Sequence, residues 1–216
     1  MTTIETLVTT VHGEGRLVTS RARRPLATLL LSHGAGGGIE ARDLAALAEV
    51  LPRQGVSVAL FEQPWRRAGR KVATPPPTLD DGLRAAARSL RTRAPLVVGG
   101  RSAGARSALR CATELGAAGC LALAFPLHPP GAPEKSRVGE LEAAAIPTLV
   151  IQGERDPMGR PEEFPADVEM TVVPGADHGF KVPARGAVTQ AEAVEIVVEA
   201  TLEWLVREVT GNQQPA

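Results

Sequence analysis

The sequence has little cysteine and no excess charge of either sign. Cys111 and Cys120 are the only cysteines in 216 residues, and their spacing matches no metal-binding or redox motif. We therefore expect no disulfide framework and predict that both thiols are small buried side chains. The 24 basic and 24 acidic residues give a formal net charge of zero, without a long block of one sign. We accordingly expect no nucleic-acid partner and no attraction to an anionic membrane.

Long apolar runs are also missing. No stretch reaches the roughly 18 apolar residues that span a bilayer, so we expect no membrane-spanning segment. The N-terminus carries no basic segment followed by an apolar one, so we expect no signal peptide and predict a cytoplasmic protein. The length suits one domain, which we place at residues 1–210, with a flexible polar tail at residues 211–216.

Apolar runs alternate with segments of helical periodicity, and the later runs are continuous, as in strands buried on both faces of a parallel sheet. We therefore predict a three-layer α/β/α domain with a mostly parallel sheet of about 7–8 strands. The first two runs flank His12-Gly13-Glu14-Gly15 and predict an antiparallel hairpin at one edge. The predicted strands are Ile4–Val11, Arg16–Ser20, Ala27–Ser32, Val56–Phe61, Leu96–Gly99, Cys120–Phe125, Thr148–Gln152 and Glu169–Val173. The predicted helices are Ala41–Leu51, Leu79–Arg91, Ala103–Leu115 and Val188–Val209.

Two longer loops, residues 62–77 and residues 126–147, are predicted at the carboxyl ends of strands, where parallel sheets bind ligands. The second loop is too short for a large lid domain, so we expect an open site. The first loop contains a basic cluster between Arg66 and Lys71. That cluster either attracts an anionic substrate or is simply solvated, and solvated arginines are the more common case.

A serine between small residues is the first candidate catalytic residue. Gly100-Arg101-Ser102-Ala103-Gly104 follows a predicted strand and opens a predicted helix. In a Gly-x-Ser-x-Gly turn, the residues two before and two after the serine crowd each other, so only very small side chains fit. The pattern predicts a sharp elbow that holds the Ser102 hydroxyl clear of the backbone beside a helix N-terminus.

A nucleophilic serine needs a base and a group that orients the base. His178 follows the last predicted strand, on the same sheet edge as the elbow, which favours it over a merely solvated histidine. Asp156 follows the preceding strand and gives the chain order Ser, Asp, His. The competitors for its place are Asp177, whose neighbouring position seldom allows contact with the ring, and Glu154.

Two backbone N–H groups are needed to stabilise an oxyanion. Ala103 at the start of the elbow helix supplies one, and Ala35 in the glycine-rich segment Ser32-His33-Gly34-Ala35-Gly36-Gly37-Gly38 supplies the other. A phosphate-binding loop is the rival interpretation of that segment. No Gly-Lys-Ser or Gly-Lys-Thr follows, however, and the dinucleotide-binding spacing is incomplete, so we expect no dinucleotide cofactor.

Four segments carry a resemblance to a known family: His33-Gly34-Ala35-Gly36-Gly37, Phe61-Glu62-Gln63-Pro64-Trp65, Gly99-Gly100-Arg101-Ser102-Ala103-Gly104-Ala105-Arg106 and Phe125-Pro126-Leu127-His128-Pro129-Pro130-Gly131. With these segments, the chain resembles α/β-hydrolases across most of its length. More narrowly, it is similar to a small bacterial family related to dienelactone hydrolase and to the hydrolase-like domain of a testis-expressed protein and a chromatin-complex subunit. The resemblance implies Ser102 as nucleophile, Asp156 as acid and His178 as base. Relatives often carry Gly at position 105 and Met at position 103, where this chain has alanines, and dienelactone hydrolase itself uses cysteine, so its activity does not transfer.

These observations predict a serine hydrolase that cleaves a small or soluble carboxylic ester or thioester through an acyl-enzyme, without a cofactor or metal. The expected partner is a small-molecule acyl substrate, and a homodimer is compatible with the sequence. The alternatives are a catalytically silent binding or scaffold protein on a hydrolase fold, or a hydrolase of amide or carbon–carbon bonds.

His128 either lines the pocket or is a hydrogen-bonded loop residue, and we favour the loop residue. Trp65 and Phe180 form either walls of the pocket or part of the core. The candidate pocket residues are His33, Gly34, Trp65, Arg101, His128 and Phe180.

Overall fold

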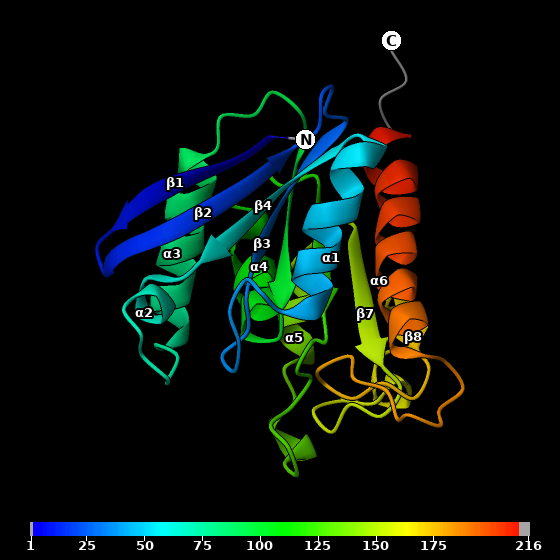
Figure 1. Ribbon diagram of the computed structural model, residues 1–216. Coiled ribbons are helices and arrows are strands. Elements are labelled where there is room, and N and C mark those ends of the chain that lie inside the picture. The colour runs from blue at the N-terminus through cyan, green and yellow to red at the C-terminus, as the bar shows by residue number, and fades with distance from the viewer. Residues whose placement is uncertain (1, 212–216) are drawn as a thin grey trace.

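One eight-stranded sheet runs through the protein, with the strand order β1-β2-β4-β3-β5-β6-β7-β8 (Figure 1). The computed structural model describes residues 2–211. The strands are β1 (Thr2–Thr10), β2 (Gly13–Arg21), β3 (Ala27–Ser32), β4 (Val56–Glu62), β5 (Leu96–Arg101), β6 (Gly119–Leu123), β7 (Thr148–Gly153) and β8 (Met170–Val173). The α-helices are α1 (Arg42–Val50), α2 (Pro64–Arg67), α3 (Pro76–Ser89), α4 (Ala103–Ala112), α5 (Val138–Glu142) and α6 (Gln190–Trp204). Short 3₁₀ turns are η1 (Leu51–Gln54), η2 (Pro133–Lys135) and η3 (Pro161–Glu163), and a π-helical turn, η4 (Leu205–Thr210), ends α6.

Strands β3 to β8 all run parallel to one another, and β2 pairs antiparallel with both β1 and β4. The predicted mostly parallel sheet and edge hairpin are therefore confirmed. The hairpin is tighter than predicted, because β2 begins at Gly13 and Thr10 pairs directly with it. Gly13 has a φ of 112°, a backbone conformation that favours glycine, so the chain reverses there over two residues.

Helices cover both faces of the sheet and form three layers, as predicted (Figure 1). Helices α1 and α6 contact each other over one face, and α3 and α4 pack together over the other. Each face has its own apolar core because successive strand side chains point to opposite sides. In β3, Leu29 and Leu31 belong to the core under α1 and α6, whereas Leu30 belongs to the core under α3 and α4.

The sequence prediction missed two short helices and one helix start. Residues 62–77 and residues 126–147 were expected to be loops, but they contain α2 and α5. Helix α3 begins at Pro76 rather than at Leu79. Proline is tolerated in the first turn of a helix because its fixed φ suits the helix and its missing N–H would have no partner there. The same reason explains Pro64 at the start of α2.

No large domain is inserted between β6 and β7. Residues 124–147 hold only η2 and α5 between the two strands. Within residues 2–211, no helix combines the length and the apolar character needed to cross a bilayer. The predicted flexible tail falls mainly on residues 212–216, which lie outside the described residues.

The largest fully buried side chain belongs to Trp204, near the end of α6, and it packs against the start of β6, where a Cβ on Gly119 would lie 2.8 Å from its ring. We predict that Trp204→Ala lowers the free energy of unfolding by about 3–5 kcal/mol, because it removes apolar contacts and leaves a cavity. Urea denaturation checks this. The control is Val72→Ala at a side chain that is 79% exposed, for which a change within about 0.5 kcal/mol is expected. Equal effects of the two substitutions would contradict the assigned packing.

Candidate active site

Ser102 lies in a strained turn between β5 and α4. Its backbone angles are φ 54° and ψ −113°, and its N–H donates to the Leu123 carbonyl at 2.9 Å. A positive φ is unfavourable for a residue with a side chain, and such strain is found most often at functional sites. The predicted elbow therefore has the expected local geometry.

The two glycines of the elbow are required by close backbone packing. A Cβ on Gly104 would lie 2.8 Å from the His33 carbonyl oxygen and would overlap the backbone of Ser32. A Cβ on Gly100 would lie 2.7 Å from the Gly104 carbonyl carbon and would also overlap the Ser32 carbonyl. Such separations are far below contact distance, so β3, β5 and α4 can meet at this point only without these side chains.

His178 connects Ser102 to Asp156 through two hydrogen bonds. Its Nε2 lies 2.9 Å from Ser102 Oγ, and its Nδ1 lies 2.7 Å from Asp156 Oδ2. A carboxylate only accepts, so Nδ1–H donates to Asp156 and Nε2 accepts from the serine hydroxyl. The ring is thereby held in the tautomer that can take a proton from Ser102.

Asp156 is fully buried, and its carboxylate is held from two further directions. Gln152 Nε2 donates to Oδ2 at 3.0 Å, and the Met158 N–H donates to Oδ1 at 2.8 Å. The same Nε2 lies 2.8 Å from the Gly159 carbonyl and 3.2 Å from the Phe125 carbonyl, so its two protons are shared among three acceptors near the ends of β6 and β7. Sequence reasoning missed Gln152, although an amide inside a buried apolar strand is a signal for such a role.

The two competitors of Asp156 hold the backbone instead. Glu154 Oε2 accepts from the Gly175 N–H at 2.5 Å. Asp177 Oδ1 accepts from the Gly179 and Lys181 N–H groups at 2.7 Å and 3.0 Å. The described residues thus bring only one carboxylate, that of Asp156, into hydrogen bonding with the His178 ring.

The loop that carries His178 is fixed by its neighbours. Phe180 has a φ of 51° and is 2% exposed, and Gln190 Nε2 donates to its carbonyl at 2.8 Å. Arg101 Nη2 donates to the His178 carbonyl at 2.7 Å. Arg101 and Phe180 therefore fix the backbone around the imidazole, and Phe180 is part of the core rather than an open pocket wall.

Arg101 forms a buried ion pair with Asp43 in the first turn of α1. The Nε–Oδ2 distance is 3.3 Å, and the Asp43 side chain is 3% exposed. Burial raises the pKa of the Asp43 carboxyl, and the Arg101 charge and backbone N–H groups oppose this rise. Arg101, which precedes Ser102, thus joins α1 to the loop that carries His178. The sequence alone did not predict the ion pair, because no motif singles out Asp43.

The candidate oxyanion donors have no other acceptor. In the part of the chain that the structure describes, neither the Ala35 N–H nor the Ala103 N–H makes a hydrogen bond. Gly34 brings the first loop against the elbow, since a Cβ on Gly34 would lie 3.2 Å from Ser102 Cβ. Ala103 begins α4, whose N-terminal partial positive charge favours an anion.

His33 supports this loop from behind rather than lining an open pocket. It is 2% exposed, and burial lowers its pKa. A neutral ring with Nδ1–H donating to the Gly34 carbonyl at 2.8 Å and Nε2 accepting from the Gln63 N–H at 3.1 Å satisfies both nitrogens. Trp65 packs edge-on against this ring and is 3% exposed, so it too belongs to the protein interior.

His128 is the hydrogen-bonded loop residue that the sequence analysis favoured. Its Nδ1 bonds to the Pro129 carbonyl at 2.9 Å, and its Nε2 bonds to Glu163 Oε2 at 2.9 Å. The Pro129 carbonyl, followed by the Glu163 carboxylate, raises the pKa of His128. Both ring nitrogens are occupied, so His128 fastens the loop after β6 to η3.

Neither cysteine has the properties of a nucleophile. Both are free and buried, as predicted. Burial raises the pKa of the Cys111 thiol to about 11 and raises that of Cys120 still further. Neither thiol forms appreciable thiolate at neutral pH, so Ser102 is the nucleophile candidate.

Comparison with known families identifies the family of this chain. A family model described as an alpha/beta hydrolase domain matches residues 25–206. The chain belongs to the α/β-hydrolase family. A search of curated proteins by sequence found no match.

Solved α/β-hydrolases share the fold over nearly the whole chain at low identity. An alpha-beta serine hydrolase homologue from Coxiella burnetii is 20% identical, with a TM-score of 0.73 and coverage of 93% of this chain and 98% of the other. A serine hydrolase from Xanthomonas campestris, described as lacking a lid, is 19% identical, with a TM-score of 0.71 and coverage of 99% and 96%. Dienelactone hydrolase from Anabaena variabilis is 18% identical, with a TM-score of 0.73 and coverage of 96% and 98%. These likenesses confirm the predicted α/β-hydrolase fold.

The buried ion pair predicts a pH-dependent loss of stability. Arg101→Ala leaves the Asp43 carboxylate buried without its counter-charge, which costs about 3–5 kcal/mol in comparable pairs. In the native protein the pKa of Asp43 is already raised, so the folded state favours the protonated carboxyl more than the unfolded chain does. The folded state therefore loses stability as the pH rises above the pKa of this carboxyl in the unfolded chain, which is about 3.9. Removing the guanidinium enlarges this shift, so the variant is expected to lose more stability at pH 8 than at pH 5 in urea titrations.

Asp43→Asn in the Arg101→Ala background is the matched control, because a neutral amide removes the titrating charge. The double variant is expected to show little additional pH dependence. A pH-independent loss for Arg101→Ala would contradict a charged pair at this site.

Proposed function

We propose that the protein is a serine hydrolase that cleaves a small or soluble carboxylic ester or thioester through an acyl-enzyme. The observation that carries this proposal is the hydrogen-bonded chain from Ser102 through His178 to Asp156. Membership of the α/β-hydrolase family and the serine hydrolases among the solved structures of this fold support it.

In the acylation step, Ser102 Oγ attacks the carbonyl carbon while His178 Nε2 takes the hydroxyl proton. Asp156 stabilises the resulting imidazolium across the 2.7 Å contact. The Ala35 and Ala103 N–H groups stabilise the negative oxygen of the tetrahedral intermediate. Collapse of the intermediate breaks the bond to the leaving alcohol or thiol, which receives the proton from His178.

Deacylation repeats the cycle with water. His178 takes a proton from the water as it attacks the acyl-enzyme, and the second tetrahedral intermediate releases the carboxylic acid while the proton returns to Ser102. None of these steps requires a metal or an organic cofactor. The residues of the chain supply the nucleophile, the base and the oxyanion donors.

The substrate class follows from the surroundings of Ser102. Ala35 and Gly36 are exposed, and the segment between β6 and β7 adds only short helices rather than a covering domain. A long-chain lipid would gain little apolar burial at such an open site, whereas a short acyl group can reach the serine without a lid opening. Soluble substrates are therefore the better fit.

We predict that Ser102→Ala lowers the turnover of p-nitrophenyl acetate by at least about 10³-fold, since the nucleophile is removed. Initial rates of purified protein measure this. Ser107→Ala is the matched control, because Ser107 lies on the same helix, is buried and has no hydrogen-bond partner among the described residues. Equal background rates for wild type and Ser102→Ala would favour a silent binding or scaffold protein on this fold.

The orienting carboxylate gives a separate prediction. Asp156→Asn replaces an acceptor with an amide that favours the wrong imidazole tautomer, so kcat is expected to fall by about 10⁴-fold with little change in the fold. Asp177→Asn is the control, because an asparagine oxygen can still accept from Gly179 and Lys181. If both variants lose activity equally, Asp156 does not have the assigned function.

A further inference from the structure

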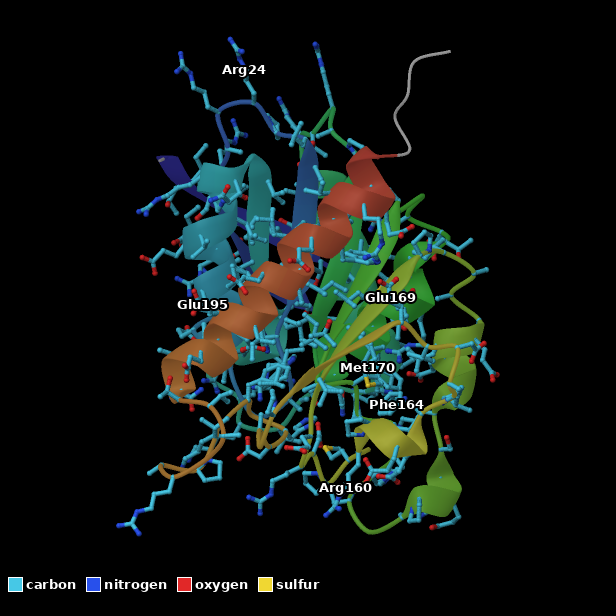
Figure 2. All side chains as sticks on the ribbon, turned by 90° about the vertical axis from the view of Figure 1, so that its right-hand side faces the viewer. Arg24, Arg160, Phe164, Glu169, Met170 and Glu195 are labelled. Carbon is cyan, nitrogen blue, oxygen red and sulfur yellow. The ribbon has the colours of Figure 1, made fainter. Side chains whose placement is uncertain are left out.

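Six arginines from three separate connections gather at the end of the sheet opposite Ser102. Strands β3, β4 and β5 are parallel, and β2 runs antiparallel to β4, so the end of β2 meets the starts of the other three. In Figure 2, Arg24 lies at this end, and Arg160, which follows the Asp156 loop, lies at the other. The arginines are Arg21, Arg23, Arg24, Arg53, Arg91 and Arg93.

These six guanidinium groups have no acidic partner. Within residues 2–211, no ion pair and no side-chain hydrogen bond involves any of them, whereas arginines such as Arg16, Arg106 and Arg110 are paired with carboxylates. The fold thus brings the arginines of residues 21–24 next to Arg53, Arg91 and Arg93 and creates a local positive potential that the zero net charge of the chain does not indicate.

Four of the six surround one hollow. Arg21, Arg23, Arg91 and Arg93 line a hollow of about 550 Å³ between the β1–β2 hairpin and the C-terminal end of α3. No Asp or Glu side chain of the described residues lines it. Its volume lies within the range of small-molecule sites, which is roughly 300–1,000 Å³.

The hollow also contains a buried hydroxyl with a free proton. Ser57 is 6% exposed, and its Oγ accepts from the Ala22 N–H at 3.1 Å. No acceptor for the Ser57 hydroxyl proton is found among the described residues, so the hydroxyl can donate into the hollow. Leu17 and Leu90 provide apolar wall beside these polar groups.

We propose that this hollow binds a small organic phosphate. Guanidinium forks match phosphate oxygens, and several unpaired forks around one hollow suit a group with more than one negative charge better than a single carboxylate. The Ser57 hydroxyl supplies a further donor, and Leu17 and Leu90 pack against the carbon skeleton of the ligand. A second hollow of about 350 Å³ shares Arg23 and is lined by Arg24 and Arg53, but it lacks the Ser57 hydroxyl and the two leucines. The concave shape of the first hollow favours a small molecule over a nucleic acid or a membrane, which contact extended surfaces. This site is independent of the proposed hydrolase activity.

Isothermal titration calorimetry at 150 mM NaCl tests the proposal. The three arms are 1-naphthyl phosphate, inorganic phosphate and ligand-free buffer of matched ionic strength. The ester is expected to bind saturably at one site per chain and more tightly than inorganic phosphate, because only the ester reaches the apolar wall. Arg91→Ser combined with Arg93→Ser is expected to weaken binding at least about tenfold, since charge-assisted hydrogen bonds are lost.

Arg42→Ser combined with Arg185→Ser is the matched control. It makes the same change in net charge at two exposed residues outside the hollow, and it is expected to leave the affinity unchanged. Circular dichroism confirms that both double variants fold. The proposal is overturned by a lack of saturable binding or by equal loss in both double variants. It is also overturned if duplex DNA or anionic vesicles bind at this salt concentration while the phosphate ester does not.

Discussion

The close approach of β3, β5 and the start of α4 is the constraint on which the candidate site depends. Gly100 and Gly104 allow the backbones to meet at Ser32, and Ser102 must then adopt a positive φ to pass from strand to helix. This strained turn projects the hydroxyl toward His178 and leaves the Ala103 N–H without an acceptor. The strain is tolerated because β5 lies between the fully buried strands β3 and β6, which leave the turn no alternative path.

The histidine is fixed from two sides by interactions of different character. Asp156 holds the ring through its Nδ1, and Gln152 and Met158 hold Asp156 in turn. Arg101 holds the backbone of the same loop through the His178 carbonyl and is itself tied to α1 by Asp43. Asp156 is hydrogen-bonded by its neighbours and Asp43 is ion-paired with Arg101, so the geometry is preorganised before substrate binds.

Periodicity and turn chemistry predicted the fold well, because strands β3 to β8 are mostly apolar and the helices between them are amphipathic. The order of Ser102, Asp156 and His178 along the chain also predicted which three side chains meet, since each follows a strand at the same sheet edge. The supporting contacts were not predictable in this way. Asp43 comes from a distant helix, and whether Trp65 and Phe180 formed pocket or core depended on three-dimensional packing. Local pattern likewise gave no sign that Arg23 and Arg91 meet at one hollow.

The central claim is that the hydrogen-bonded chain makes Ser102 a nucleophile in the folded protein. Treatment with a fluorophosphonate, followed by mass spectrometry of the intact protein and of its peptides, tests it most directly. The account predicts one phosphonyl adduct per chain, formed with loss of fluoride and located on Ser102, and no adduct after thermal unfolding. Absence of labelling in the folded protein, or an adduct on another serine, would contradict it.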